Sequence, residues 1–297
     1  MNRDLPRLGF IGAGTIATAL SGSLRAEGYT VAAVASRSFS SSQKLAALVS
    51  GCVPFENMQH VADSADILFI TTPDDAILEV AGQIEWQTGK SVVHCSGADS
   101  SEILRQAKLE GAQTGVFHPL QTFAGAAQAV KSLKDITFSL EAEEPLLTQL
   151  KEMAEALGGH WIAINLEDRV LYHASAVMGS NYLVTLVKLA TELWDDFGLS
   201  REDAVRALLP LIKGTINNIE TVGLPACLTG PISRGDSGTV QKHVRDLEKH
   251  HPDILKTYCE LGLKTIPIAL EKGRIDARKA KEIEAVLQGC RILGSKT

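Results

Sequence analysis

The chain has 297 residues, of which 45% are hydrophobic and 22% are charged, and its formal net charge at pH 7 is −6. This composition is typical of a globular protein and excludes disordered, collagen-like and coiled-coil chains. The length predicts two domains. The mildly acidic balance argues against a nucleic-acid partner, because binding to a phosphate backbone requires clustered positive charge.

The cysteines and the apolar runs indicate a cytoplasmic protein. The five cysteines are widely spaced and include no Cys-x-x-Cys pair, so they predict neither a disulfide framework nor a metal site. Asn2, Arg3 and Asp4 stand at the N-terminus in place of a long apolar signal region. No apolar run reaches the roughly 18–20 residues that a membrane-spanning helix needs, so no membrane partner is expected.

The first 165 residues alternate short β-branched runs with helical stretches. Some runs, such as residues 68–70, are apolar throughout, which is typical of parallel strands covered on both faces. Strands are predicted over residues 8–11, 30–35, 67–71, 91–95, 113–117, 136–140 and 160–164, and helices over 16–27, 42–49, 76–84, 101–109 and 145–157. This alternation predicts an α/β fold with a doubly wound, mostly parallel Rossmann sheet over residues 1–165.

Residues 166–297 predict a second domain that is mostly or wholly helical. One long helix is expected over 167–197, where apolar residues recur at helical spacing. Further helices are expected over 201–220, 240–249, 252–271 and 276–287. Residues 228–239 are rich in glycine and hydroxyl groups and predict a loop, with Thr239 able to cap the helix that follows.

A glycine-rich turn follows the first predicted strand. Gly12-Ala13-Gly14-Thr15-Ile16-Ala17 forms a Gly-x-Gly-x-x-Ala pattern that opens the first predicted helix. Gly12 allows a tight turn, Gly14 lets the backbone approach a pyrophosphate, and Ala17 lets the helix pack closely on the strand. Together with the free N–H groups of the helix N-terminus, residues 12–16 predict a dinucleotide site. The alternative is a glycine turn that binds nothing.

The end of the second strand indicates which dinucleotide is bound. In NAD-binding sheets an acidic residue at this point binds the ribose 2′-hydroxyl. Here the strand ends in Ser36-Arg37-Ser38 with no acid nearby, and an Arg between two hydroxyls suits a 2′-phosphate. The predicted cofactor is therefore NADP, the alternative being a solvated turn. Thr71, Thr72 and Pro73 end a neighbouring strand and are predicted to lie beside the cofactor, unless they form a plain turn.

Two polar clusters end the next two predicted strands. Ser96 follows the strand over 91–95, and His118 follows the strand over 113–117. Adjacent parallel strands bring both residues to one edge of the sheet, and a histidine near its usual pKa of about 6.5 can donate a proton to a reacting atom. We predict that His118 is the proton donor, with Ser96 beside it. A hydrogen-bonded structural histidine is the alternative, and it is the expected role of His94.

The helical half supplies further candidate residues. His173 and Asn181 lie in polar patches of the long predicted helix and are predicted to close the substrate pocket. Polar contacts across a helix or a dimer are the alternative. Thr229, Gly230 and Arg234 lie in the 228–239 loop and are predicted to bind an anionic group of the substrate, the alternative being a mobile linker.

Several of these motifs together resemble one bacterial family. They are the glycine-rich opening strand, Ser36-Arg37-Ser38, His118-Pro119-Leu120-Gln121, Tyr172-His173-Ala174-Ser175 and the segment from Thr229 to Asp236. The family joins a Rossmann-like oxidoreductase domain to a helical C-terminal domain of unknown function. It is related to pyrroline-5-carboxylate reductase, prephenate dehydrogenase and 6-phosphogluconate dehydrogenase. The resemblance implies hydride chemistry and a homodimer formed through the helical domain. The His118-Pro119 motif is similar to that of prephenate dehydrogenases, whose histidine contacts the substrate with help from an upstream serine, the place of Ser96 here.

These observations predict an NADP-dependent oxidoreductase. It is expected to transfer hydride to or from a small carbonyl or imine compound that carries a carboxylate, and a ketopantoate-like 2-keto acid is one candidate. The alternative is a non-catalytic NADPH-binding sensor or regulatory protein, in which His118 is structural. A purely structural dimerisation module leaves the glycine-rich turn without a role.

Overall fold

The computed structural model describes residues 5–123, 125 and 133–293. The chain divides into two compact units, Met1–Asn181 and Tyr182–Thr297. The first unit therefore extends past the predicted boundary at residue 165 and includes the helix α8 (Arg169–Gly179).

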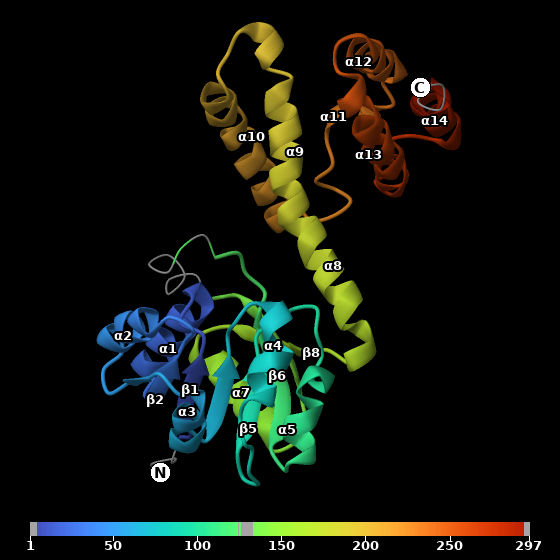
Figure 1. Ribbon diagram of the computed structural model, residues 1–297. Helices are drawn as coiled ribbons and strands as arrows, with labels where there is room; N and C mark the ends of the chain where they lie inside the picture. The colour runs from blue at the N-terminus through green and yellow to red at the C-terminus, as the bar shows by residue number, and fades with distance from the viewer. Residues whose placement is uncertain (1–4, 124, 126–132, 294–297) are drawn as a thin grey trace. The chain divides into compact units, whose positions relative to one another are not determined.

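The first unit is built on an eight-stranded sheet with the strand order β3-β2-β1-β4-β5-β6-β7-β8 (Figure 1). Neighbouring strands from β3 to β6 are parallel, β7 runs antiparallel to β6, and β8 is parallel to β7. The predicted mostly parallel Rossmann sheet is confirmed. The strands are β1 Arg7–Ile11, β2 Thr30–Ala35, β3 Val53–Phe55, β4 Ile67–Ile70, β5 Ser91–His94, β6 Gln113–Pro119, β7 Thr137–Ala142 and β8 His160–Ala163.

Helices cover both faces of this sheet, because alternate residues of its central strands point in opposite directions. The helices are α1 Thr15–Ala26, α2 Phe39–Leu48, α3 Met58–Ser64, α4 Ile77–Gly82, α5 Arg105–Leu109 and α7 Leu146–Ala156, with the 3₁₀ turns η1 Asp74–Ala76 and η2 Ser101–Leu104. Leu8 and Phe10 of β1 belong to a core shared with α1, α2 and α7, whereas Ile11 belongs to a second core shared with α3, α4 and α5.

The edge strand β3 and the helix α3 were not predicted. β3 has three residues, and Pro54 stands in the middle of it. Proline has no N–H to donate to a neighbouring strand and is tolerated mainly at sheet edges. A strand this short, with proline inside it, carries no periodic signal in the sequence.

The predicted long helix over 167–197 is interrupted. It consists of the 3₁₀ turn η4 (Leu166–Asp168), α8, α9 (Asn181–Glu192) and the 3₁₀ turn η5 (Asp195–Phe197), with a break at Ser180. One residue of α8 is buried, Arg169, and one residue of α9, Thr191.

The second unit is helical, as predicted. It contains most of α9, then α10 Arg201–Val222, α11 Gly230–Arg234, α12 Ser237–His250, α13 Pro252–Glu271 and α14 Ala277–Leu293. Its core lies among α11 to α14 and includes Val240, Ile283 and Leu287, which are fully buried. In α10, by contrast, Ala204 alone is buried.

The loop prediction for residues 228–239 is partly wrong. The segment folds into α11, and α12 begins at Ser237. The cap of α12 is Asp236, whose carboxylate accepts the backbone N–H of Thr239 at 2.9 Å and its hydroxyl at 2.7 Å. Thr239 therefore donates to the capping residue and does not itself act as the cap.

Two expectations from the sequence need correction. Cys259, buried in α13, is disulfide-bonded, whereas Cys52, Cys95 and Cys227 are free thiols. In addition, the helical stretch Leu166–Phe197 is long and apolar enough to cross a membrane by length and composition, with a mean hydropathy of 1.2 in its most apolar window. The prediction that no run reaches this length is therefore wrong by that measure.

Candidate active site

The glycine-rich turn lies at the C-terminal edge of the sheet, where β1 leads into α1. Gly12 adopts a φ of +102°, and a Cβ there would lie 2.8 Å from the carbonyl carbon and oxygen of Thr71. The turn approaches β4 this closely only because residue 12 is glycine. The N–H of Gly12 donates to Ala35 O, and the N–H of Thr71 donates to Ile11 O, both at 2.8 Å. Both neighbouring strands therefore hold the turn in place.

Gly14 forms the open side of this turn. It is exposed, and a Cβ at this position would meet nothing within 4 Å. Gly14 precedes α1, whose N-terminus has no side-chain cap and no acidic residue in its first turn. The free N–H groups and the positive end of the helix dipole thus remain available to an anion.

The Ser36-Arg37-Ser38 segment follows β2 at the same edge. Arg37 and Ser38 are exposed, and the Ser38 hydroxyl lies 2.9 Å from that of Ser40. Within the described parts of the chain, the Arg37 guanidinium makes no hydrogen bond or ion pair. Its charge is therefore available for a phosphate group.

The three residues after β4 differ in how they are used. The hydroxyl of Thr71 lies 3.1 Å from the carbonyls of Ile11 and Gly12, so it is engaged within the protein. The hydroxyl of Thr72 is buried and has no hydrogen-bond partner among the described residues. Pro73 is exposed. A buried unpaired hydroxyl costs free energy, which a ligand with a hydrogen-bonding group would recover. With the open approach at Gly14, this unpaired hydroxyl fits a dinucleotide.

Ser96 is enclosed by its own loop and by η1. It is 3% exposed, and its hydroxyl lies 2.8 Å from Asp74 Oδ2 and 3.0 Å from Asp99 Oδ2. The same oxygen accepts the N–H groups of Ala98 and Asp99. Among the described residues no hydrogen bond links the Ser96 hydroxyl to His118. The hydroxyl therefore stabilises the loop and does not directly assist the histidine.

His94 is a structural residue, as expected. Its Nδ1 accepts the N–H of Ser96 at 3.2 Å, and its Nε2 lies 3.1 Å from the carbonyl oxygen of Ser100, to which it donates in the matching tautomer. Burial lowers the pKa of His94, so the ring is neutral at neutral pH. Cys95 beside it is buried, and this burial raises the pKa of its thiol, which excludes a nucleophilic role.

His118 meets Tyr172 and His173 above Gly97. The Nδ1 of His118 lies 2.9 Å from the hydroxyl of Tyr172, and its ring is edge-on to both Tyr172 and His173, with centroids 5.7 and 6.4 Å away. A Cβ on Gly97 would lie 2.7 Å from the His173 ring and 2.9 Å from His118 Nε2. The missing side chain at residue 97 thus makes room for both imidazoles. The structure brings together two of the predicted residues, His118 and His173, within the first unit.

Burial sets the charge of His118. It lowers the pKa of this histidine from its usual 6.5 to about 4, and the positive charge of Arg169 acts in the same direction. The pKa near 6.5 that is expected of a proton-donating histidine is therefore wrong for His118, because its ring is buried. His118 is neutral at neutral pH and acts as a hydrogen-bond donor or acceptor.

This shift predicts a pH dependence of stability. The folded-state pKa of His118 lies below its unfolded value, so folding favours the neutral ring. The associated stability is present above about pH 6.5 and is lost as the pH falls toward 4, by about 3 kcal/mol in the free energy of unfolding. Urea unfolding at pH 7 and pH 4 measures this loss. The His118→Asn chain should lose correspondingly less stability between these two pH values, and equal losses in the two proteins would contradict the shift.

Arg169 connects α8 to the sheet through hydrogen bonds and an ion pair. It is fully buried, and its Nε donates to Asp99 O at 2.8 Å. Its Nη2 donates to Ser96 O at 3.3 Å and to the Ser139 hydroxyl at 3.2 Å, and its Nη1 lies 3.5 Å from Glu141 Oε2. Because Tyr172 and His173 lie three and four residues further along α8, they share the face that Arg169 anchors.

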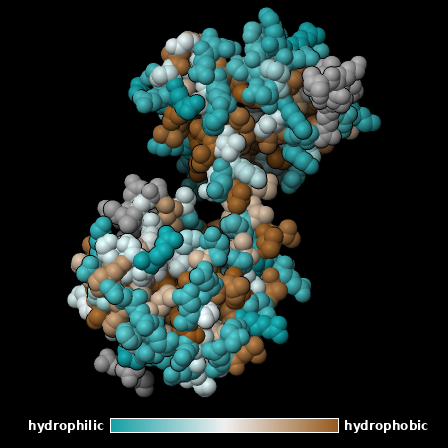
Figure 2. Space-filling view, viewed as in Figure 1, coloured by the Kyte–Doolittle hydropathy of each residue, from teal (hydrophilic) through white to brown (hydrophobic). Residues whose placement is uncertain are grey.

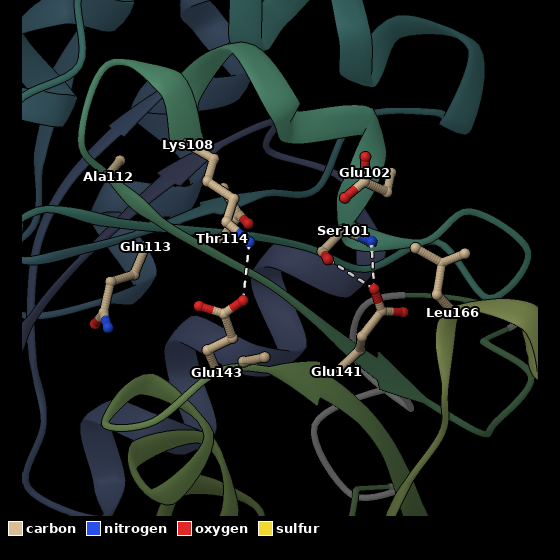
Figure 3. Close-up of a pocket in the computed structure, with 10 residues that line it drawn as sticks. Ser101, Glu102, Lys108, Ala112, Gln113, Thr114, Glu141, Glu143 and Leu166 are labelled. Carbon is tan, nitrogen blue, oxygen red and sulfur yellow. Dashed lines mark hydrogen bonds and ion pairs between the residues drawn. The ribbon is translucent and has the colours of Figure 1, made fainter.

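The carboxylate of Glu141 is the acidic partner of Arg169. It also lines a pocket of about 300 Å³ in the first unit, where its Oε1 accepts the N–H and the hydroxyl of Ser101 at 2.8 and 2.6 Å (Figure 3). In the same pocket Lys108 pairs with Glu143 at 2.9 Å. One oxygen of Glu141 is thus engaged by Ser101 and the other faces Arg169.

The remaining predicted site residues belong to α9 and to the second unit. Asn181 is exposed at the first residue of α9, eight residues beyond His173, which corresponds to roughly 12 Å along a helix. Thr229, Gly230 and Arg234 lie in the second unit around α11. Sequence reasoning missed Arg169, although an arginine within an apolar helix is a signal that it has a buried partner.

Comparison with known families agrees with this architecture. Residues 7–97 match the family described as NADP oxidoreductase, coenzyme F420-dependent. Residues 136–265 match a domain of unknown function, DUF2520, which begins at the last two strands of the sheet and continues into the helical unit. No curated protein sequence matches the chain.

Solved structures share the fold over nearly the whole chain. BF3122 from Bacteroides fragilis, a candidate NADP oxidoreductase, is 26% identical, with coverage of 89% of this chain and 98% of its own, and a TM-score of 0.70. TM1727 from Thermotoga maritima is also 26% identical, with coverage of 96% and 99% and a TM-score of 0.67.

A more distant structure shows likeness of fold alone. The reductive aminase from Aspergillus terreus, solved with NADPH and ethyl-5-oxohexanoate, is 13% identical, with coverage of 98% and 95% and a TM-score of 0.62. The chain thus matches the NADP oxidoreductase family model over its N-terminal part and the DUF2520 model over residues 136–265, the combination that its motifs indicated.

Proposed function

We propose that this protein is an NADP-dependent reductase of a small carbonyl or imine compound that carries a carboxylate. The observation that carries the proposal is the meeting of His118, Tyr172 and His173 above Gly97. The sheet register supports it. Ile11, Ile70, His94 and Val116 are aligned across four strands, so the phosphate turn after β1 and the histidine on β6 share one edge. Solved proteins with this fold include a reductive aminase in complex with NADPH and an imine reductase, both from Aspergillus terreus.

The chain's own residues have separate roles. The N–H groups at Gly14 and the α1 N-terminus would hold the pyrophosphate, Thr72 would hydrogen-bond the cofactor, and Arg37 would hold the 2′-phosphate. When bound, NADPH would supply the hydride. In the tautomer in which the Tyr172 hydroxyl donates to Nδ1 of neutral His118, the ring proton is on Nε2, next to Gly97. As the hydride adds to the substrate carbon, His118 donates this Nε2 proton to the substrate oxygen or nitrogen, Nδ1 takes the proton of Tyr172, and solvent returns a proton to Tyr172.

A panel of 2-keto acids and cyclic imines, followed by NADPH absorbance, tests this function. Turnover of at least one compound is expected. NADPH binding without turnover of any compound would favour the alternative function, a non-catalytic NADPH sensor.

Arg37 is expected to set the preference for NADPH. Replacing Arg37 by Ala should weaken NADPH binding by about 10- to 100-fold and leave NADH binding nearly unchanged, because only the 2′-phosphate loses a charge-assisted hydrogen bond. Fluorescence titration with both nucleotides measures this. Arg105→Ala, which removes an exposed arginine on α5, is the control. Equal weakening for both nucleotides, or tighter NADH binding by the native chain, would refute this role.

We further propose that the protein is a homodimer formed through α9 and α10. Val184, Leu211 and Val222 are among the large apolar side chains that these helices leave exposed. Figure 2 shows apolar surface gathered over the two helices. A group of exposed apolar side chains on neighbouring helices indicates a protein–protein interface. Sedimentation should give a dimer, and Leu211→Glu should shift it toward monomer. Association with lipid vesicles in place of self-association would instead assign the apolar stretch to a membrane.

A further inference from the structure

A second pocket lies wholly within the helical unit. It has a volume of about 390 Å³ and lies between α11 and the segment that follows α13. Arg234, Lys272 and Arg274 line it together with Thr229 and Gly230. Three side chains with full positive charge therefore face this space, and none of the residues that line it is acidic.

The backbone carbonyl of Leu228 accepts hydrogen bonds from two side chains that line this pocket. The oxygen of Leu228 accepts the ammonium of Lys272 at 2.6 Å and the hydroxyl of Ser233 at 3.2 Å. Lys272 is thereby held in place beside the cavity. Ser233 is 4% exposed, so this part of the wall belongs to the packed core of the unit.

The two arginines have no comparable hydrogen-bond partner, although the charge of Arg234 acts on the nearby carboxylate of Asp236. Within the part of the chain that the structure describes, neither Arg234 nor Arg274 forms an ion pair within 4 Å. The acid closest in sequence to Arg234, Asp236, is already hydrogen-bonded to Thr239 at the start of α12. The guanidinium N–H groups of each arginine can therefore bind a carboxylate or a phosphate with two parallel hydrogen bonds.

The backbone leaves the approach open. Gly230 has a φ of +92°, and a Cβ at this position would meet nothing within 4 Å. Thr229 precedes α11, and its side chain makes no capping hydrogen bond. The Thr229 hydroxyl is thus a further donor beside the three cations.

We propose that this pocket binds a dianionic ligand. Its lining holds three cations and no acid, so the cations repel one another, and a dianion offsets that repulsion more fully than a single carboxylate does. The anion site does not depend on the proposed function.

Calorimetric titration of the full chain tests the site with malonate, inorganic phosphate and acetate as probes. We expect saturable binding of malonate or phosphate at least tenfold tighter than that of acetate. Phosphate binding alone would indicate a phosphorylated ligand, and malonate binding alone would indicate a dicarboxylate. No saturable binding, or equal binding of acetate, would overturn the proposal.

Two exposed positions allow a variant test without loss of the fold. Arg234→Ala and Arg274→Ala should each weaken binding of the dianion by about tenfold or more, and Arg274→Lys should weaken it less. Lys264→Ala, an exposed lysine of α13 outside the pocket, should bind as the native chain does. Dianion binding that these arginine variants leave unchanged would overturn the site. NADPH titration of the same variants reports separately on the cofactor site.

Discussion

The His118→Ala chain should bind NADPH within about twofold of the native affinity and turn over substrate about 100- to 1,000-fold more slowly. Loss of one donor aimed at developing negative charge has an effect of this size on kcat. KM should change little, because the donor acts mainly in the transition state. Steady-state NADPH oxidation with a substrate from the panel measures both constants.

Two further variants sharpen this result. His160→Ala removes an exposed histidine at the start of β8 and should leave the rate unchanged. Tyr172→Phe keeps the ring but loses the hydroxyl that faces His118 Nδ1, so a smaller loss of about tenfold is expected as the tautomer becomes less fixed. A His118→Ala chain with native kcat would remove His118 from the reaction and require another donor.

The Arg169→Met chain should lose about 3–5 kcal/mol in the free energy of unfolding. Methionine fills a similar volume, but Glu141 is left without its cationic partner, and the acceptors on Asp99, Ser96 and Ser139 lose their donor. Breaking a buried ion pair from one side has a cost of this order. Urea unfolding at neutral pH measures it.

A second substitution at Glu141 checks whether the loss of stability comes from the unpaired carboxylate. Adding Glu141→Gln to Arg169→Met should recover part of the lost stability, because the unpaired charge is removed as well. Arg206→Met breaks an exposed pair with Asp203 and should cost less than about 1 kcal/mol. Equal losses for Arg206→Met and Arg169→Met would show that the buried network contributes little.

The sheet and the phosphate turn were predictable because their signals are local. The apolar run Leu68-Phe69-Ile70 forms β4, and the Gly-x-Gly-x-x-Ala pattern forms the turn into α1 as expected. β3 was missed because Pro54 breaks its pattern. The cap of α12 was misassigned because Asp236 and Thr239 both suit the role, and only the backbone geometry distinguishes them.

The candidate site was predictable in its residue types but not in its chemistry. His118 and His173 were singled out from two separate motifs, and the structure places them together. The pKa of His118 depends on burial and on Arg169, which lies far away in sequence, so no local pattern reveals it. The direction of the Ser96 hydroxyl likewise depends on Asp74, which belongs to η1.

The bare backbone at Gly97 constrains how this protein can diverge. Even a methyl group there would collide with both the His173 and His118 rings, so the three positions have to change together. Relatives that carry alanine at the equivalent of residue 97 should have exchanged at least one imidazole for something smaller. Such covariation would separate chains that keep this chemistry from chains that share only its scaffold.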